Sequence, residues 1–308
     1  MPTLKVIRPG MLTTVQDLGR WGEQSMGVPV GGPMDEYSHV LANQLIGNSP
    51  HAASLEVTLM GPELEASADV TCAVAGAMFE LNAGGLDVPM HAAFALRKGQ
   101  RLRFGARSAG ARATLAVRGG IDVPAVFGSR ATNLISRMGP FDGRALKAGD
   151  ELPIATVPAK DRGAIHALPL PLPVGGAQLR VMAGPQEDRF TADAYRTLFG
   201  SRYAITPASN RMGYRLEGPR LAHRRGADIL SDATPLGAIQ VPASGQPILL
   251  MADRQTTGGY PKIAVVITAD MPIAGQLAPG DWIEFLPCTR DAAIDALKQR
   301  HQGLGVTR

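Results

Sequence analysis

Residues 70–74 read Val-Thr-Cys-Ala-Val, a short apolar run in the middle of a series of strand-like segments. Upstream, Leu55–Leu59 alternates apolar and polar side chains. Downstream follow three more short segments, Phe94–Leu96, Arg101–Phe104 and Thr114–Val117. Short strands at this spacing, separated by turns, are typical of antiparallel barrels and sandwiches. We therefore predict a mainly β fold with a few helices.

The composition is that of a globular chain with many turns. The 308 residues are enough for two domains, and 36 glycines and 24 prolines favour turns over long helices. A net charge of +4 is too small to indicate a nucleic-acid-binding surface. There is no secretory signal pattern, no apolar run of about 18 residues, and no CxxC among the cysteines. We expect a cytoplasmic protein that binds neither nucleic acid nor membrane.

The second half of the chain repeats the order of features in the first. In each half a strand-like segment precedes a helix signal, and these helices end at Gly47 and Gly200. Gly61-Pro62-Glu63-Leu64 then matches Gly218-Pro219-Arg220-Leu221, and later matches keep the same order. The separation between matching residues only grows along the chain, which indicates one fold used twice, with small insertions. The period is far longer than the 20 to 50 residues of solenoid repeats.

Changes in composition set the expected domain boundaries. Prolines cluster between residues 157 and 177, which is typical of a linker. A final helix is expected after Thr289, a plausible N-cap, with Ala293, Ile294 and Leu297 on its apolar face. The predicted organisation is an N-terminal half at 1–156, a linker at 157–177, a C-terminal half at 178–290 carrying the main site motifs, and a C-terminal helix and tail at 291–308.

Each half departs from the shared plan with one polar, Gly-rich segment. In the second half it is Asp253-Arg254-Gln255-Thr256-Thr257-Gly258-Gly259-Tyr260-Pro261-Lys262, which lies between two apolar runs and predicts a β-hairpin turn. In the first half it is a loop within residues 12–33. The two halves share a scaffold, so we predict that function lies in the two segments that they do not share. The sequence leaves open whether these segments meet at one site. The alternative is that the Asp253–Lys262 segment is only a polar turn.

Several common catalytic sequences are absent. There is no Gly-x-x-x-x-Gly-Lys-Ser/Thr phosphate loop and no Gly-x-Ser-x-Gly nucleophile turn. None of the six histidines has a partner at metal-ligand spacing. We therefore expect no metal site and no P-loop on this chain. A Met-Lys-Met biotinylation sequence is also absent, so biotin is not carried on this chain.

The remaining polar residues concentrate in the second half. Two segments, Ser209–Arg215 and Ser231–Gln240, precede the Asp253–Lys262 segment. Arg side chains hold carboxylate or phosphate groups through paired hydrogen bonds, Lys supplies a mobile charge, and Asp acts as a base or orients a cation. The structural alternatives are a turn cap for Asp232, surface ion pairs for Arg211 and Arg215, and packing roles for Tyr214 and Tyr260.

These motifs together resemble a known family, variously called biotin-dependent carboxyltransferase, allophanate hydrolase subunit 2 and the C subunit of 5-oxoprolinase. The resemblance runs in order from residue 3 to about residue 290. The segments that carry it are Arg8-Pro9-Gly10, Thr13–Arg20, Gly27-Val28-Pro29, Met34-Asp35, Ser209–Arg215 and Asp253–Lys262.

The resemblance implies two tandem cyclophilin-like β-barrel domains related by internal duplication. It also implies a choice of functions. One is the C subunit of an ATP-dependent 5-oxoprolinase, which binds the B subunit directly, works with the A subunit, and opens 5-oxo-L-proline to L-glutamate. Another is the carboxyltransferase component of a biotin-dependent urea carboxylase. A third is a non-catalytic regulatory subunit that binds the homologue of the B subunit. The length and the missing biotin carrier favour the first.

On this interpretation the chain is a subunit of an amide (lactam) hydrolase, inactive alone, in which the complex uses ATP. Opening a lactam requires stabilisation of charge at its carbonyl oxygen. We expect Asp232, Asp253 and Lys262 to be catalytic, and Gln16, Asp17 and Arg20 to form a second functional segment. The expected substrate-binding residues are Asn210, Arg211, Tyr214, Arg215, Gln240, Arg254, Gln255, Thr256, Thr257, Gly258, Gly259 and Tyr260.

Overall fold

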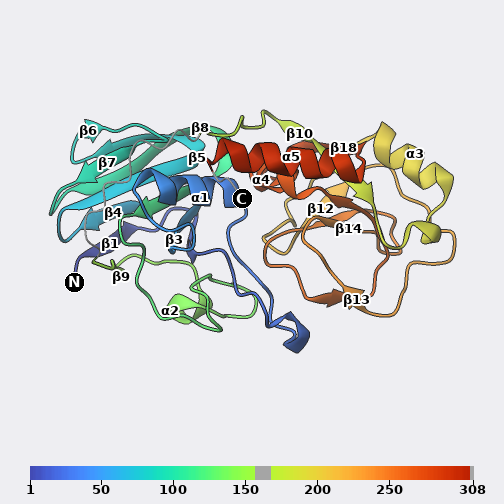
Figure 1. Ribbon diagram of the computed structural model, residues 1–308, viewed down its shortest axis with the longest axis horizontal. Coiled ribbons are helices and arrows are strands. Elements are labelled where there is room, and N and C mark those ends of the chain that lie inside the picture. The colour runs from blue at the N-terminus through green and yellow to red at the C-terminus, as the bar shows by residue number, and fades with distance from the viewer. Residues whose placement is uncertain (157–167, 306–308) are drawn as a thin grey trace. The chain divides into compact units, whose positions relative to one another are not determined.

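The computed structural model describes residues 1–156 and 168–305, and its ribbon is drawn in Figure 1. The mainly β fold is confirmed, with strands far outnumbering helices in the described residues. The described chain forms two compact units. The first takes in the described residues of Met1–Trp21, Gly31–Leu172 and Gly303–Arg308, and the second those of Gly22–Val30 and Pro173–Gln302.

The first unit is a nine-stranded sheet with the order β2-β3-β8-β4-β1-β9, in which β5 also pairs with β6, β7 and β8. Its strands are β1 (Thr3–Arg8), β2 (Leu12–Gln16), β3 (Ser54–Thr58), β4 (Glu63–Ala66), β5 (Val70–Ala83), β6 (Leu86–Asp87), β7 (Ala93–Leu96), β8 (Arg101–Val117) and β9 (Glu151–Pro153). Its helices are α1 (Glu36–Leu45) and α2 (Pro140–Gly143).

The two faces of β5 explain how this sheet is packed. Cys72 and Val74 face the larger apolar core of the unit, whereas Ala73 and Ala75 lie in the cluster formed with α1. Small side chains on the second face let the helix approach the sheet closely. A strand buried on both faces reads as a continuous apolar run, as residues 70–77 do.

The second unit is a closed seven-stranded barrel with the order β10-β17-β14-β15-β12-β11-β18. Its strands are β10 (Gly176–Ala183), β11 (Arg202–Ile205), β12 (Gly213–Glu217), β14 (Ala238–Gln240), β15 (Ile248–Leu250), β17 (Lys262–Val266) and β18 (Trp282–Pro287). β13 (Asp232–Ala233) and β16 (Thr257–Gly258) form a separate two-stranded sheet. The α-helices are α3 (Ala192–Gly200), α4 (Met271–Gly275) and α5 (Arg290–Gly303). Three 3-10 turns, η1 (Gln24–Met26), η2 (Glu187–Arg189) and η3 (Thr268–Asp270), complete the unit.

The two units share the order strand, helix, strands, but their strands pair differently. β10 runs parallel to β18, and this pairing closes the barrel. β1 instead pairs antiparallel with β4 and β9. Both helices that follow the first strands begin at side-chain caps, since Asp35 accepts from Ser38 N and Thr191 accepts from Ala194 N.

The observed boundaries differ from the predicted ones in several places. Residues 157–167 of the predicted linker lie outside the described residues, and β10 already begins at Gly176. The segment Gly22–Val30 groups with the second unit rather than the N-terminal half. The final helix is present where it was expected, as α5 from Arg290 to Gly303, and its residues up to Gln302 group with the second unit.

Two local predictions were wrong. Leu12–Gln16 was expected to be part of a loop but forms β2, which is paired along its length with β3. In α5 the expected apolar face included Ile294, but this side chain is exposed and Ala296 is the buried residue. Ala296 packs with Ile267 and Ala269, so the helix presents the Ala296 side to the rest of the unit rather than the Ile294 side. No helix among the described residues is long and apolar enough to span a membrane.

In the first unit, the nearly buried carboxylate of Glu63 forms ion pairs with three arginines. Glu63 in β4 accepts from Nε of Arg103 at 3.0 Å and pairs with Arg101 and Arg8 at 3.3 Å. Burial raises the pKa of Glu63, but the hydrogen bond and charge of Arg103, with the other arginines, outweigh it and hold the pKa below its ordinary value. The charged form is therefore favoured in the folded protein.

We predict that Glu63→Gln lowers the free energy of unfolding by about 1 kcal/mol at pH 7, because the arginine partners are exposed and screened by solvent. The folded-state pKa is depressed, so this contribution is present above the unfolded pKa and is lost as pH falls through the folded pKa. Thermal unfolding of wild type and variant between pH 7 and pH 3 should therefore converge at low pH. A gap that widens on acidification would contradict the assignment. Glu65→Gln, which breaks only a more exposed pair with Arg101, is the control and should cost less.

Candidate functional site

The Asp253–Lys262 segment is not the turn of a hairpin. The strands before and after it, β15 and β17, do not pair with each other, because each pairs with a different edge of β14. The segment is therefore an excursion that leaves the barrel after β15 and returns at β17. The chain between β12 and β14 forms a second excursion. The two are joined where Asp232–Ala233 pairs with Thr257–Gly258 in a two-stranded sheet separate from the barrel, of which β13 is labelled in Figure 1.

Thr234 fastens the two excursions together. Its backbone N–H donates to the carbonyl oxygen of Thr256 at 3.1 Å, and its hydroxyl donates to the carbonyl oxygen of Gln255. Its own carbonyl oxygen accepts from Nε of Arg254 at 2.8 Å. Arg254 is partly buried, and desolvation lowers the pKa of its guanidinium while the charge of Asp253 acts in the opposite direction. The Arg254 side chain thus binds the backbone of the neighbouring excursion.

A buried ion pair anchors the start of the Asp253–Lys262 segment. Nε and Nη2 of Arg211 donate to the two carboxylate oxygens of Asp253 at 2.9 and 3.0 Å. The residues are only 5% and 3% exposed. The backbone N–H of Asp253 also donates to the carbonyl oxygen of Arg211 at 2.8 Å. A two-point ion pair of this kind fixes both position and orientation. It is not the surface ion pair considered from the sequence.

A second ion pair anchors the end of the segment. The Lys262 side chain is fully buried, and its Nζ donates to Oδ2 of Asp232 at 2.9 Å. Gln186 bridges the same two residues, since its Nε2 donates to Asp232 at 3.1 Å and its Oε1 accepts from the backbone N–H of Lys262. The Lys262 hydrogen bond, followed by that of Gln186, holds the pKa of Asp232 below its ordinary value.

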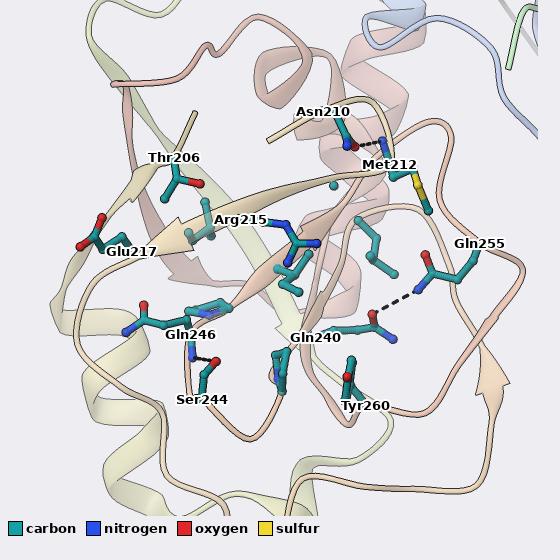
Figure 2. Close-up of a pocket in the computed structure, with 16 residues that line it drawn as sticks. Thr206, Asn210, Met212, Arg215, Glu217, Gln240, Ser244, Gln246, Gln255 and Tyr260 are labelled. Atoms are coloured by element: carbon teal, nitrogen blue, oxygen red, sulfur yellow. Dashed lines mark hydrogen bonds between the residues drawn. The ribbon is translucent and has the colours of Figure 1, made fainter. Parts of the chain in front are cut away.

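Beside these anchors the second unit contains a cavity of about 710 Å³ (Figure 2). Its volume falls within the range of small-molecule sites. It is lined by Thr206, Asn210, Met212, Gly213, Arg215, Leu216, Glu217, Gln240, Pro242, Ser244, Gln246, Pro247, Ile248, Leu250, Gln255 and Tyr260. Figure 2 shows Arg215 reaching inward from β12 and Gln240 and Gln255 turned toward each other. The guanidinium of Arg215 has no hydrogen-bond or ion-pair partner among the described residues.

Five of the predicted site residues line this cavity, namely Asn210, Arg215, Gln240, Gln255 and Tyr260. The others do not line it, and most of them position the excursions around it: Arg211, Asp232, Asp253, Arg254, Thr256, Thr257, Gly258, Gly259 and Lys262. Tyr214 is fully buried, and its hydroxyl lies 3.1 Å from the carbonyl oxygens of Ala274 and Leu277. That placement corresponds to the packing alternative for Tyr214.

The sequence reasoning missed several polar residues of the cavity, namely Thr206, Glu217, Ser244 and Gln246. A signal existed for Glu217, because residues two apart on a strand share a face and Arg215 was already a candidate. Thr206, Ser244 and Gln246 lie outside the strands, and the sequence contains no pattern that links them to β12.

The three candidate residues of the first half, Gln16, Asp17 and Arg20, form hydrogen bonds within the first unit. Gln16 donates from Nε2 to Thr14 and to the carbonyl oxygen of Thr132. Asp17 accepts from the hydroxyl of Ser129 and from backbone N–H groups. Arg20 is buried and donates to carbonyl oxygens of residues 126 and 131. These contacts tie residues 126–132 to the end of β2 and to the residues that follow it. Among the described residues, no group of three His, Cys, Asp or Glu side chains is arranged to hold a metal ion.

We predict that Asp253→Ala destabilises the second unit by about 3–5 kcal/mol, because it leaves the Arg211 charge buried without its carboxylate. This corresponds to a fall in Tm of roughly 10 °C by the usual scaling. The paired replacement of Arg211→Met with Asp253→Leu should lose much less, since no charge is then left buried. Asp193→Ala removes an exposed ion pair with Arg196 and is the control, expected to change Tm little. A wild-type Tm for Asp253→Ala would show that the pair is not an anchor.

The chain is similar to known proteins over nearly its whole length. Residues 26–287 match the family model described as the carboxyltransferase domain, subdomain A and B. The chain is 38% identical over 299 residues to the C subunit of 5-oxoprolinase from Escherichia coli (strain K12), and the match covers 97% of this chain and 96% of that protein. It is 36% identical over 272 residues to the corresponding C subunit from Haemophilus influenzae, covering 88% and 87%.

Two solved structures share the fold at higher than 30% identity. The Kluyveromyces lactis urea amidolyase has a TM-score of 0.91 and 32% identity, covering 98% of this chain. The protein TTHA0988 has a TM-score of 0.84 and 37% identity, covering 93% of this chain. The chain spans 55% of TTHA0988 and 20% of the amidolyase. With a family model that matches most of its length, this chain belongs to the carboxyltransferase family defined by subdomains A and B.

Proposed function

We propose that this chain is the C subunit of an ATP-dependent 5-oxoprolinase, which converts 5-oxo-L-proline to L-glutamate together with the A and B subunits. The observation that carries the proposal is similarity over matching lengths. The Escherichia coli 5-oxoprolinase C subunit is covered over 96% of its length, whereas the Saccharomyces cerevisiae urea amidolyase is 31% identical and covered over only 17%. A chain that matches a subunit from end to end is best interpreted as the same kind of subunit.

The cavity offers chemistry that suits this substrate. 5-Oxo-L-proline carries one carboxylate and one lactam group. The Arg215 guanidinium, which has no described partner, can hold the carboxylate through paired hydrogen bonds. The amides of Gln240 and Gln255 and the hydroxyl of Tyr260 supply neutral polar groups on neighbouring walls. Placing the carboxylate at Arg215 leaves the lactam ring free to face these groups.

In this proposal the remaining chemistry is supplied by the complex. In the proposed reaction the complex uses ATP, and this chain has no P-loop sequence. The direct partner is the B subunit, and the enzyme, which we place in the cytoplasm, is completed by the A subunit. The ion-paired residues Asp232, Asp253 and Lys262 then act by holding the excursions that frame the cavity.

A second candidate function is the carboxyltransferase component of a urea carboxylase-type system. It is favoured by the TM-score of 0.91 to the Kluyveromyces lactis urea amidolyase. In that case carboxybiotin is delivered by another chain, and the same cavity receives a urea-like amide. Both substrates present a carbonyl group, so the choice depends on whether the ligand also carries a carboxylate for Arg215.

Reconstitution separates these functions. With the A and B subunits present, ATP-dependent release of L-glutamate from 5-oxo-L-proline should require this chain, and this chain alone should be inactive. Urea-dependent consumption of carboxybiotin, with no glutamate release, would establish the second function instead. Glutamate release by this chain alone would contradict the multi-subunit proposal.

We predict that Arg215→Ala raises KM for 5-oxo-L-proline by about 10- to 100-fold, the usual effect of losing a charge-assisted hydrogen bond of about 1.5–3 kcal/mol. Arg215→Lys should restore part of the affinity, because the charge remains but the paired geometry is lost. Arg225→Ala removes another exposed arginine, away from the cavity lining, and is the control. Steady-state kinetics of the complex measures all three. An unchanged KM in Arg215→Ala would exclude Arg215 as the carboxylate site.

A further inference from the structure

The wall formed by Gln240 holds a buried donor that has no partner. Gln240 ends β14 and is 2% exposed. Its Oε1 accepts from Nε2 of Gln255 over a long 3.4 Å hydrogen bond. Its own Nε2 is buried and has no hydrogen-bond partner among the described residues. Buried amide donors are normally satisfied, because leaving one unpaired costs free energy. An exception at the wall of a cavity calls for a functional explanation.

Gly258 gives the two amides the room to come together. A Cβ atom at this glycine would lie 2.6 Å from Nε2 of Gln240 and 3.3 Å from Nε2 of Gln255. Both amide nitrogens therefore lie against the same side of Gly258. Gly258 lies in β16, and its φ is outside the left-handed region, so its backbone does not require glycine there. Because Gly258 has no side chain, the amide groups of Gln240 and Gln255 have room beside it.

We propose that Gln240 and Gln255 form a donor pair that receives the carbonyl oxygen of the lactam, and that Gly258 is glycine to leave room for this pair. The inference rests on the proposed function and names the residues that contact the reacting group. Gln240 supplies the fixed donor, since it is buried on a barrel strand. Gln255 is partly exposed and held to Gln240 by a long hydrogen bond, so its side chain turns to admit the ligand and then donates to the same oxygen.

The charge of the hydrogen-bond donors in the cavity determines which group of the ligand each one binds. Two neutral amide N–H groups suit an uncharged carbonyl oxygen, whereas the carboxylate of the same molecule is drawn to the Arg215 cation. The two anchoring points come from different strands, β12 for Arg215 and β14 for Gln240. When a nucleophile attacks the carbonyl carbon, the electrons of the C=O π bond move onto that oxygen, and the fixed N–H groups stabilise it more than in the ground state.

Gln240→Met is the decisive variant, because it keeps the length of the side chain and removes the donor. In the reconstituted complex we expect kcat/KM for 5-oxo-L-proline to fall about 100-fold, the usual effect of removing one such donor. We expect Tm to stay the same or rise, because a buried unpaired polar group is removed. A purely structural glutamine would behave in the opposite way. A kcat/KM within threefold of wild type would overturn the proposal.

Gly258→Ala tests the space that the pair needs. The added Cβ displaces the Gln240 and Gln255 amides, so kcat/KM should fall by at least 10-fold. Gly200→Ala at the end of α3 is the control, because a Cβ there meets no atom within 4 Å and its φ is also outside the left-handed region. Equal activity of Gly258→Ala and wild type would count against the proposal.

A binding experiment on the unmodified chain separates this inference from the proposed function. The side-chain NH₂ signal of Gln240 is followed by NMR while 2-pyrrolidinone, a lactam without a carboxylate, or pyrrolidine, without a carbonyl, is added. We expect the signal to shift with 2-pyrrolidinone and with 5-oxo-L-proline but not with pyrrolidine. If the complex releases glutamate and no shift occurs, the inference fails while the function stands. If the shift occurs and no glutamate is released, the carbonyl site stands and the proposed function fails.

Discussion

The buried ion pair between Arg211 and Asp253 is the constraint on which the candidate site depends. It fixes the point at which the Asp253–Lys262 segment leaves the barrel, and the Lys262–Asp232 pair fixes the point at which the segment returns. Between these points Thr234 binds the backbone of the segment at two places. A ten-residue excursion held at both ends and in the middle presents its side chains on a rigid support, as precise recognition of a small ligand requires.

This arrangement separates residues that hold the site from residues that face the ligand. Three charged residues of the polar segments, Arg211, Asp253 and Lys262, are buried. Arg211 pairs with Asp253, and Lys262 pairs with Asp232. Breaking such pairs is costly, whereas their net stabilisation is small, so their value lies in fixing geometry. The groups that face the cavity are fewer and mostly neutral, and Arg215 is the cation among them that has no described partner.

The sequence predicted the mainly β fold and most strands, because alternation and turn residues are local signals, and five of the predicted site residues line the cavity. It failed where the outcome depends on pairing between distant strands. The segment looked like a hairpin turn because apolar runs flank it, but β14 lies between those runs in the barrel. Likewise Thr13–Gln16 looked like loop because of its polar residues, which are buried in β2 by contacts with residue 132 and β3.

The same reasoning explains which site residues could be predicted. Arg215, Gln240, Gln255 and Tyr260 were identified because they lie in the polar segments of the second half. Thr206, Ser244 and Gln246 were not, because only the folded barrel brings them to the cavity. The sequence also could not separate the residues that anchor the segment from those that face the cavity. Arg211, which is paired with a buried carboxylate, and Arg215, which faces the cavity, look alike in a sequence.

A crystal structure of this chain with 5-oxo-L-proline tests the central claim most directly, which is that the cavity of the second unit is the substrate site. The account predicts that the ligand lies in this cavity, with its carboxylate on Arg215 and its lactam oxygen between the amides of Gln240 and Gln255. A ligand bound elsewhere on the chain, or one in this cavity with its lactam oxygen turned away from Gln240, would contradict it.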